Sequence, residues 1–74
     1  MEINGLNVLL FKTNIRTESD KQFIIQLMQQ NEINQCTIDQ EDVDCVLRIV
    51  SNELQLNDVI TLVSRHGYHC EELI

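Results

Sequence analysis

The densest set of candidate metal ligands in the sequence lies near its carboxyl end. The segment His66-Gly67-Tyr68-His69-Cys70 offers two imidazoles and a thiol, and neutral imidazole and thiolate are common zinc ligands. The spacing matches no closed structural zinc site, and in a regular strand His69 and Cys70 point to opposite faces. His66, His69 and Cys70 are therefore an alternative metal site. The simpler interpretation places His66 at a helix end, His69 in solvent and Cys70 in the core.

Cys36 and Cys45 complete a set of three cysteines. The number is odd, the spacing is wide and no CxxC is present, which favours free thiols in a reducing compartment over a disulfide framework. Because both residues fall on strands that we expect to be neighbours, a two-thiol metal site across the hairpin is one alternative. Free cysteine is among the most buried residue types, so the simpler prediction is that the three thiols pack in the core.

Groups that could catalyse hydrolysis are few and poorly placed. Four carboxylates gather in a polar turn: Asp39, Glu41, Asp42 and Asp44. A hairpin tip rarely provides the dry, concave setting of a catalytic acid, and this segment also lacks the spacing of a calcium loop. Ser64 has only His66 as a nearby base and no oxyanion device. We therefore expect a protein that is not an enzyme.

Composition restricts the partner and the compartment. The 74 residues give room for a single domain, residues 1–74. The net charge of −7 argues against nucleic acid, whose binding depends on neutralising phosphates, and favours basic protein surfaces. The longest apolar run, Val8 to Phe11, is far shorter than the roughly 20 residues of a membrane span, and the segment Met1 to Gly5 lacks the basic residues of a signal peptide. We expect a cytoplasmic protein with no membrane insertion.

Four segments alternate between apolar and polar residues, as half-buried strands do: residues 6–13, 33–39, 45–50 and 68–73. In the third segment Leu47 and Ile49 share one face, and Arg48 lies on the other. Between them two segments place apolar residues at helical spacing, the first fading near Gln30-Asn31 and the second running over 55–66. Thr17 or Ser19 can cap the first helix, and Gly67 is a stop residue for the second.

This order predicts an α+β, ferredoxin-like fold, β-α-β-β-α-β, with a four-stranded antiparallel sheet in the spatial order 4-1-3-2 and both helices on one face. The opposite face then has no helix over it. Five residues are expected to point there: Val8, Leu10, Val46, Arg48 and Val50. That is more apolar surface than a small acidic domain needs, so this face is a candidate interaction surface.

Three groups of residues, in this order and at this spacing, are typical of one family. They are Phe11-Lys12-Thr13-Asn14-Ile15, then Ile38-Asp39 followed by Val46-Leu47-Arg48-Ile49, then Val59-Ile60 with Gly67-Tyr68. Over almost its whole length the chain resembles the heavy-metal-associated (HMA) domain, the small ferredoxin-like module of copper chaperones and metal-transporting ATPases, and in particular its short stand-alone bacterial versions. The resemblance implies a metal-chaperone-like module.

The chemistry that the resemblance implies lacks its ligands in this sequence. The family binds Cu(I) or Zn(II) through a CxxC between the first strand and first helix. An ungapped register places Thr17 and Asp20 at the two cysteine positions, and Ile15 where the family often has Met. A hydroxyl and one carboxylate are hard ligands and too few, so we expect no metal or other cofactor there. Tyr68, near a family position beside the metal loop, is then predicted to be a core aromatic.

Two functions follow from these observations. The first is an HMA-like domain that lacks the metal loop and serves protein interaction or accessory binding, by pairing its open sheet face or a sheet edge with a partner protein or another copy. The alternative is Cu or Zn binding or trafficking through relocated Cys and His ligands. A third reading, a regulatory domain that binds a small ligand such as an amino acid, comes only from other uses of this fold.

Overall fold

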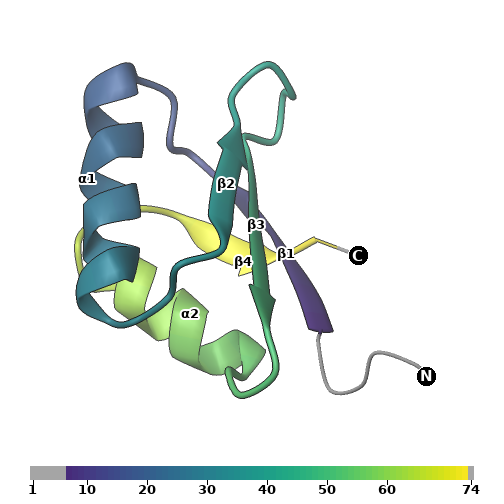
Figure 1. Ribbon diagram of the computed structural model, residues 1–74. Helices are drawn as coiled ribbons and strands as arrows, with labels where there is room; N and C mark the ends of the chain where they lie inside the picture. The colour runs from purple at the N-terminus through teal and green to yellow at the C-terminus, as the bar shows by residue number, and fades with distance from the viewer. Residues whose placement is uncertain (1–6, 74) are drawn as a thin grey trace.

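The computed structural model describes residues 7–73 and has the predicted α+β, ferredoxin-like βαββαβ order (Figure 1). The elements are β1 (Asn7–Thr13), α1 (Glu18–Gln30), β2 (Cys36–Asp39), β3 (Val46–Ser51), α2 (Leu56–Ser64) and β4 (Cys70–Glu72). Leu6, predicted to begin the first strand, and the segment Met1 to Gly5 lie outside the described residues. No helix in the described range is long and apolar enough to cross a membrane.

The four strands form one antiparallel sheet in the order β2-β3-β1-β4, which confirms the predicted arrangement. β1 and β3 are the central pair, with Leu10 opposite Arg48 and Phe11 opposite Leu47. The two edge strands are short, because β2 has four residues and β4 has three. Both helices cover one face of the sheet (Figure 1).

The hydrophobic core lies between the sheet and the two helices. Its large, fully buried side chains come from β1, β3, the β1–α1 loop and both helices: Phe11, Ile15, Ile24, Met28, Leu47, Ile49, Val59 and Val63. Burial of such a side chain stabilises the folded state by about 1.5–3 kcal/mol. Strand alternation and helical spacing therefore predicted the inward faces correctly, and Thr13 joins them as a buried polar residue.

Helix α1 begins where the sequence predicts. Thr17 is its N-cap residue, and Thr17 Oγ1 accepts a hydrogen bond from the Asp20 N–H at 3.0 Å. Ser19, the other predicted cap, lies inside the helix. Glu18 and Asp20 place negative charge at the positive end of the helix dipole, which adds to the stability of this start.

The turn that ends α1 includes the residue at which the second strand was predicted to begin. The Ile33 N–H donates to the Met28 carbonyl at 2.8 Å and the Glu32 N–H to the Gln29 carbonyl at 3.0 Å, the two bonds of a Schellman motif. Glu32 adopts a φ of +64°, a left-handed value that suits Gly or Asn better. Because the Ile33 amide belongs to this turn, the prediction of a strand from residue 33 is wrong, and β2 begins at Cys36.

Helix α2 is shorter than the predicted 55–66. Gln55 is its N-cap residue, and Asp58 Oδ2 accepts the Gln55 N–H at 3.0 Å. At the other end, the N–H groups of His66 and Gly67 bond to carbonyls three residues back, so the last turn is no longer α-helical. Gly67, the predicted stop residue, has a φ of +89°. The helix therefore ends at Ser64.

Two further strands begin later than predicted, because the residues before them have other backbone partners or angles. Cys45 has a φ of +45° and its N–H donates to the Asp42 carbonyl, so β3 begins at Val46. The His69 N–H donates to Asn14 Oδ1 at 2.9 Å, so β4 begins at Cys70. β3 is thus moved by one residue, to Val46–Ser51, and β4 is shortened, while the direction of their side chains is unchanged.

Candidate functional site

The sheet face opposite the helices, which we call the open face, carries the five residues predicted as an interaction surface: Val8, Leu10, Val46, Arg48 and Val50. Val8 lies opposite Val50 and Leu10 opposite Arg48 on adjacent antiparallel strands, and opposed residues project to the same side of a sheet. Val8 is 52% exposed and Leu10 is 37% exposed, whereas Val46 and Val50 are half-buried. The structure therefore gathers these side chains on one surface.

Arg48 is the cation at the centre of the open face. Its directly opposed neighbours are Leu10 on β1 and Thr37 on β2, and both are uncharged. The ion pairs found within residues 7–73 do not include the exposed Arg48 guanidinium. An exposed cation with an apolar neighbour and no anionic partner is a group that a bound molecule can complement.

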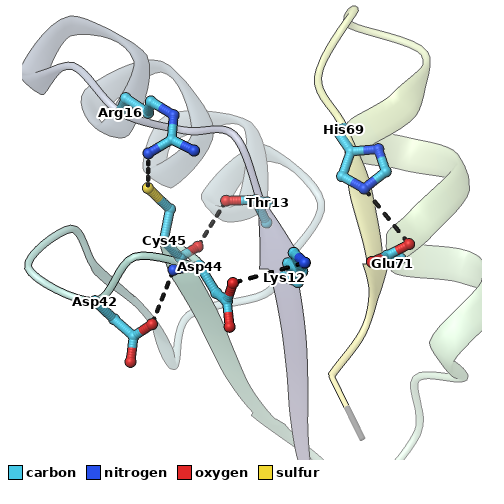
Figure 2. A network of polar contacts seen from close by, with 8 residues as sticks. All are labelled: Lys12, Thr13, Arg16, Asp42, Asp44, Cys45, His69 and Glu71. Atoms are coloured by element: carbon cyan, nitrogen blue, oxygen red, sulfur yellow. Dashed lines mark hydrogen bonds and ion pairs between the residues drawn. The ribbon is translucent and has the colours of Figure 1, made fainter.

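Lys12, the other cation of the open face, already has anionic neighbours. Its Nζ lies 3.7 Å from Asp44 Oδ1, and Lys12 is opposite Glu71 on β4 (Figure 2). Asp44 belongs to the turn before β3, where its N–H donates to Asp42 Oδ1 at 2.8 Å. At this end of the open face the charged groups are solvent-exposed and partly paired with one another. The exposed apolar residues, Val8 and Leu10, lie toward the other end.

The β1–α1 loop uses Thr17 and Asp20 as a helix start. Thr17 Oγ1 accepts the Asp20 N–H, and Asp20 Oδ1 accepts the Tyr68 hydroxyl at 2.7 Å. That hydrogen bond is the main reason why the pKa of Tyr68 lies above its usual value, and burial and the Asp20 charge add to it. Tyr68 was predicted to be a core aromatic. It is half-buried, with its ring against the core and its hydroxyl bonded to Asp20 in the first turn of α1.

Two polar residues that the sequence analysis did not identify fix the same loop. Thr13 Oγ1 donates to the Cys45 carbonyl at 2.6 Å (Figure 2) and accepts the Ile15 N–H at 3.2 Å. Gln40 Nε2 donates to the carbonyls of Ile15 and Thr17, at 3.3 and 2.8 Å. The Ile15 side chain is fully buried. The position of Thr13, a polar residue on the inward side of a predicted strand, is a signal that could have identified it. No sequence pattern marks Gln40.

Cys45 lies beside this loop as a buried hydrogen-bond acceptor. Its side chain is 1% exposed, and Arg16 Nη1 donates to its Sγ across 3.7 Å (Figure 2). The turn that positions Cys45 is held by the bond from its N–H to the Asp42 carbonyl. The contact between Arg16 and Cys45 therefore joins the β1–α1 loop to the β2–β3 hairpin.

The register of the sheet separates the three thiols. Cys36 lies opposite Ile49, and Cys45 precedes Ile49 by four residues, which is about 13 Å along a strand. The alternative two-thiol site across the hairpin is therefore not formed. Cys70 lies on β4, at the other edge of the sheet. Burial raises the pKa of Cys36 to about 11, and burial together with the Glu71 charge raises that of Cys70 to about 11, so both thiols are protonated at neutral pH.

The alternative ligands at the carboxyl end do not converge. Cys70 is buried, whereas His69 is exposed and its Nε2 lies 3.5 Å from Glu71 Oε1 (Figure 2). The His66 ring packs edge-on against Phe23, with the ring centroids 5.4 Å apart. Within residues 7–73, no group of three or more His, Cys, Asp or Glu side chains is placed to hold a metal ion.

Phe23 forms an aromatic cluster that the sequence analysis did not identify. Its ring packs against His66 and lies 6.2 Å from the Tyr68 ring, measured between centroids. Phe23 is 43% exposed. The segment after α2 that packs against Phe23 is distant from it in the sequence, so no local pattern marks the cluster. The cluster links α1 to the connection between α2 and β4, beside Asp20.

The chain matches no protein-family model, and neither a curated protein nor a solved structure is found to be similar to it. The resemblance to the heavy-metal-associated domain therefore stays a prediction.

Proposed function

We propose that this chain is a non-enzymatic interaction domain that binds a partner protein through the open face of its sheet. The observation that carries the proposal is Arg48, an exposed guanidinium outside the ion pairs of the described residues and next to the exposed Leu10. A partner that places a carboxylate on Arg48 and apolar side chains on Val8 and Leu10 would complement both features.

A second copy of the chain fits this face less well than a different protein does. Strands spaced about 4.8 Å apart and of these lengths present about 300 Å² of sheet, whereas a stable interface buries roughly 800 Å² on each partner, so a complex with any partner through this face alone should be transient. Each copy also carries a net charge of −7, so two copies repel one another. We therefore assign the open face to a protein of net positive charge that offers one carboxylate to Arg48, in a transient complex.

The resemblance to the heavy-metal-associated domain supports the same proposal. The βαββαβ order agrees with that family, and Thr17 and Asp20 stand where the family has its two metal thiolates. Their oxygens are engaged by the α1 cap and by Tyr68. We infer an HMA-like module that retains the fold without the metal loop and acts through its sheet.

Matched charge reversals test the proposal. Arg48→Glu changes the open face, and Arg65→Glu makes the same charge change at an exposed residue after α2. Proteins that the wild-type chain captures from a lysate of its native cells are purified and titrated against both variants by calorimetry. Arg48→Glu should weaken binding about tenfold or more, and Arg65→Glu no more than about twofold, because a direct charge contact outweighs a screened one.

Equal binding by wild type and Arg48→Glu, or an equal loss in both variants, would contradict the assignment. So would the absence of any protein that the wild type retains and Arg48→Glu loses. Sedimentation equilibrium addresses the second copy, for which a monomer is expected. A dimer that Arg48→Glu dissociates would give the open face to self-association.

A further inference from the structure

A polar cleft is lined by residues of the α1–β2 and β3–α2 connections. Both connections lie at the end of the molecule away from the β1–α1 loop (Figure 1). Its volume is about 310 Å³, at the small end of the range for ligand sites. Glu32 comes from the first connection and Glu53 from the second. Three apolar residues also line it: Ile33, Val50 and Leu54.

Two independent features give this cleft a negative potential. Glu32 and Glu53 are exposed, they take no part in the ion pairs of residues 7–73, and no basic residue lines the cleft. Helix α1 ends here, and its last turn carries no basic side chain, so nothing in that turn balances the negative end of the helix dipole. A cation is therefore the complementary ligand.

The apolar lining selects the kind of cation. Ile33 is only 6% exposed, and Val50 and Leu54 are half-buried, so they offer a firm surface for an alkyl chain. The remaining wall residues carry carboxamide or hydroxyl oxygens: Asn31, Asn34, Gln35, Ser51 and Asn52. An ammonium group has three donors, which two carboxylates and one such oxygen can accept together.

We propose that this cleft binds a primary aliphatic ammonium group, supplied by a free diamine or by a lysine side chain of another protein. An adjoining hollow of about 340 Å³ shares Asn31, Ile33 and Leu54 with the cleft, but it is also lined by Arg65. Asp58 also lines that hollow, so its one carboxylate is offset by Arg65, whereas the cleft has two carboxylates and no basic residue, which directs the ligand to Glu32 and Glu53. The cleft adjoins the open face at Val50, but ammonium binding there does not depend on the proposed function.

Nuclear magnetic resonance titration of the isotope-labelled full chain at low salt tests the site. The probes are cadaverine and Nα-acetyl-lysine methylamide, and pentanediol is the uncharged control for cadaverine. Both amines should shift the backbone amide signals of residues 31–35 and 51–54 in a saturable manner. The variant Glu32→Gln/Glu53→Gln should weaken binding about tenfold, as expected for the loss of two exposed ion pairs. The control Glu41→Gln/Glu72→Gln, with the same charge change elsewhere, should leave binding within about twofold.

The probes also separate the two sources of the ammonium. Binding of the lysine amide alone assigns the site to a protein side chain, and binding of cadaverine alone assigns it to a free diamine. Shifts spread equally over the acidic turn at residues 39–44 would reveal a diffuse counterion effect and overturn the proposal, as would binding of pentanediol or the absence of saturation. Glu32→Gly relieves the left-handed backbone at this position and should also weaken binding, which guards against a loss caused by misfolding.

Discussion

Tyr68 and Asp20 lie 48 positions apart in the sequence and are joined by a hydrogen bond of 2.7 Å from the phenol hydroxyl to Oδ1. The bond connects the segment before β4 to the first turn of α1. Asp20 also donates its N–H to Thr17 Oγ1, so one residue serves both the cap of α1 and the closure of the fold.

Tyr68→Phe removes this bond and leaves the ring in place. We expect the free energy of unfolding to fall by about 1 kcal/mol, the usual worth of a hydrogen bond at a half-exposed site. Urea denaturation of wild type, Tyr68→Phe, Asp20→Asn and the double variant measures the coupling. Additive losses would show that the two side chains do not interact.

The hydrogen bond between Tyr68 and Asp20 contributes to the free energy of unfolding in a pH-dependent way. This dependence is the control for the double-mutant cycle. Because the folded-state pKa of Tyr68 is raised above 10.0, the hydroxyl is protonated in both states below pH 10.0 and the bond contributes fully. Its contribution is lost as the pH rises through the raised pKa. The stability difference between wild type and Tyr68→Phe should therefore shrink in strongly alkaline solution and be constant at neutral pH.

Thr13→Val is expected to destabilise the protein by about 2 kcal/mol, because the substitution leaves the buried Cys45 carbonyl and Ile15 N–H without their side-chain partner. Thr13→Ser keeps the hydroxyl and loses one methyl group, so it should cost about 1 kcal/mol or less. Thermal denaturation gives both values. A valine variant as stable as the serine variant would contradict the bridging role of the hydroxyl.

Cys36 and Cys70 should react slowly with a disulfide reagent in the native protein at pH 8. A pKa of about 11 in place of 9.0 leaves about one hundredth of the usual thiolate, the reactive form. The raised pKa also favours folding below pH 9.0, and this contribution is lost as the pH rises toward 11. Mass spectrometry after timed labelling reads each site, with urea-unfolded protein as the control. Rapid labelling of either thiol in the folded chain would refute the burial argument.

Thr17→Cys/Asp20→Cys places two thiols at the α1 N-terminus, where the helix dipole stabilises thiolate. We expect native mass spectrometry to detect one Cu(I) per chain in this variant and no defined Cu(I) adduct in the reduced wild type, whose residues here are hard ligands. Loss of the cap and of the Tyr68–Asp20 hydrogen bond should together cost about 2 kcal/mol of stability. A wild-type adduct that Cys70→Ser removes would restore the hypothesis of relocated ligands, and a double variant without Cu(I) would count against the family register.

The inward and outward faces of the elements were predictable because burial follows the local repeat of apolar residues. Leu47 and Ile49 are buried and Val8 and Leu10 are exposed, as the alternation predicts. The ends of the elements were less predictable, since they depend on backbone partners. Ile33 is drawn into the turn that ends α1, and the His69 N–H is bonded to the Asn14 side chain. No side-chain pattern marks such bonds.

The candidate site was likewise predictable in one respect and unpredictable in another. The five residues of the open face follow from strand order, because order and alternation together decide which side chains share a surface. That Arg48 takes part in no ion pair of the described chain depends on where each nearby carboxylate lies, and only the structure gives this. The contact between Arg16 and Cys45 joins residues 29 positions apart, so no local pattern indicates it. The left-handed backbone of Cys45 was not predictable either, because cysteine has no preference for a positive φ.

The brevity of the two edge strands affects how the protein behaves at high concentration. β2 offers four residues and β4 three, so either edge can add only a short ladder of hydrogen bonds with another chain. Fibril growth requires a longer segment, about six or seven residues, whose strands stack from one molecule to the next. The exposed Val8 and Leu10 can therefore attract other molecules without seeding an extended fibril. An assembly formed through this domain should stay small, and it should dissolve again on dilution.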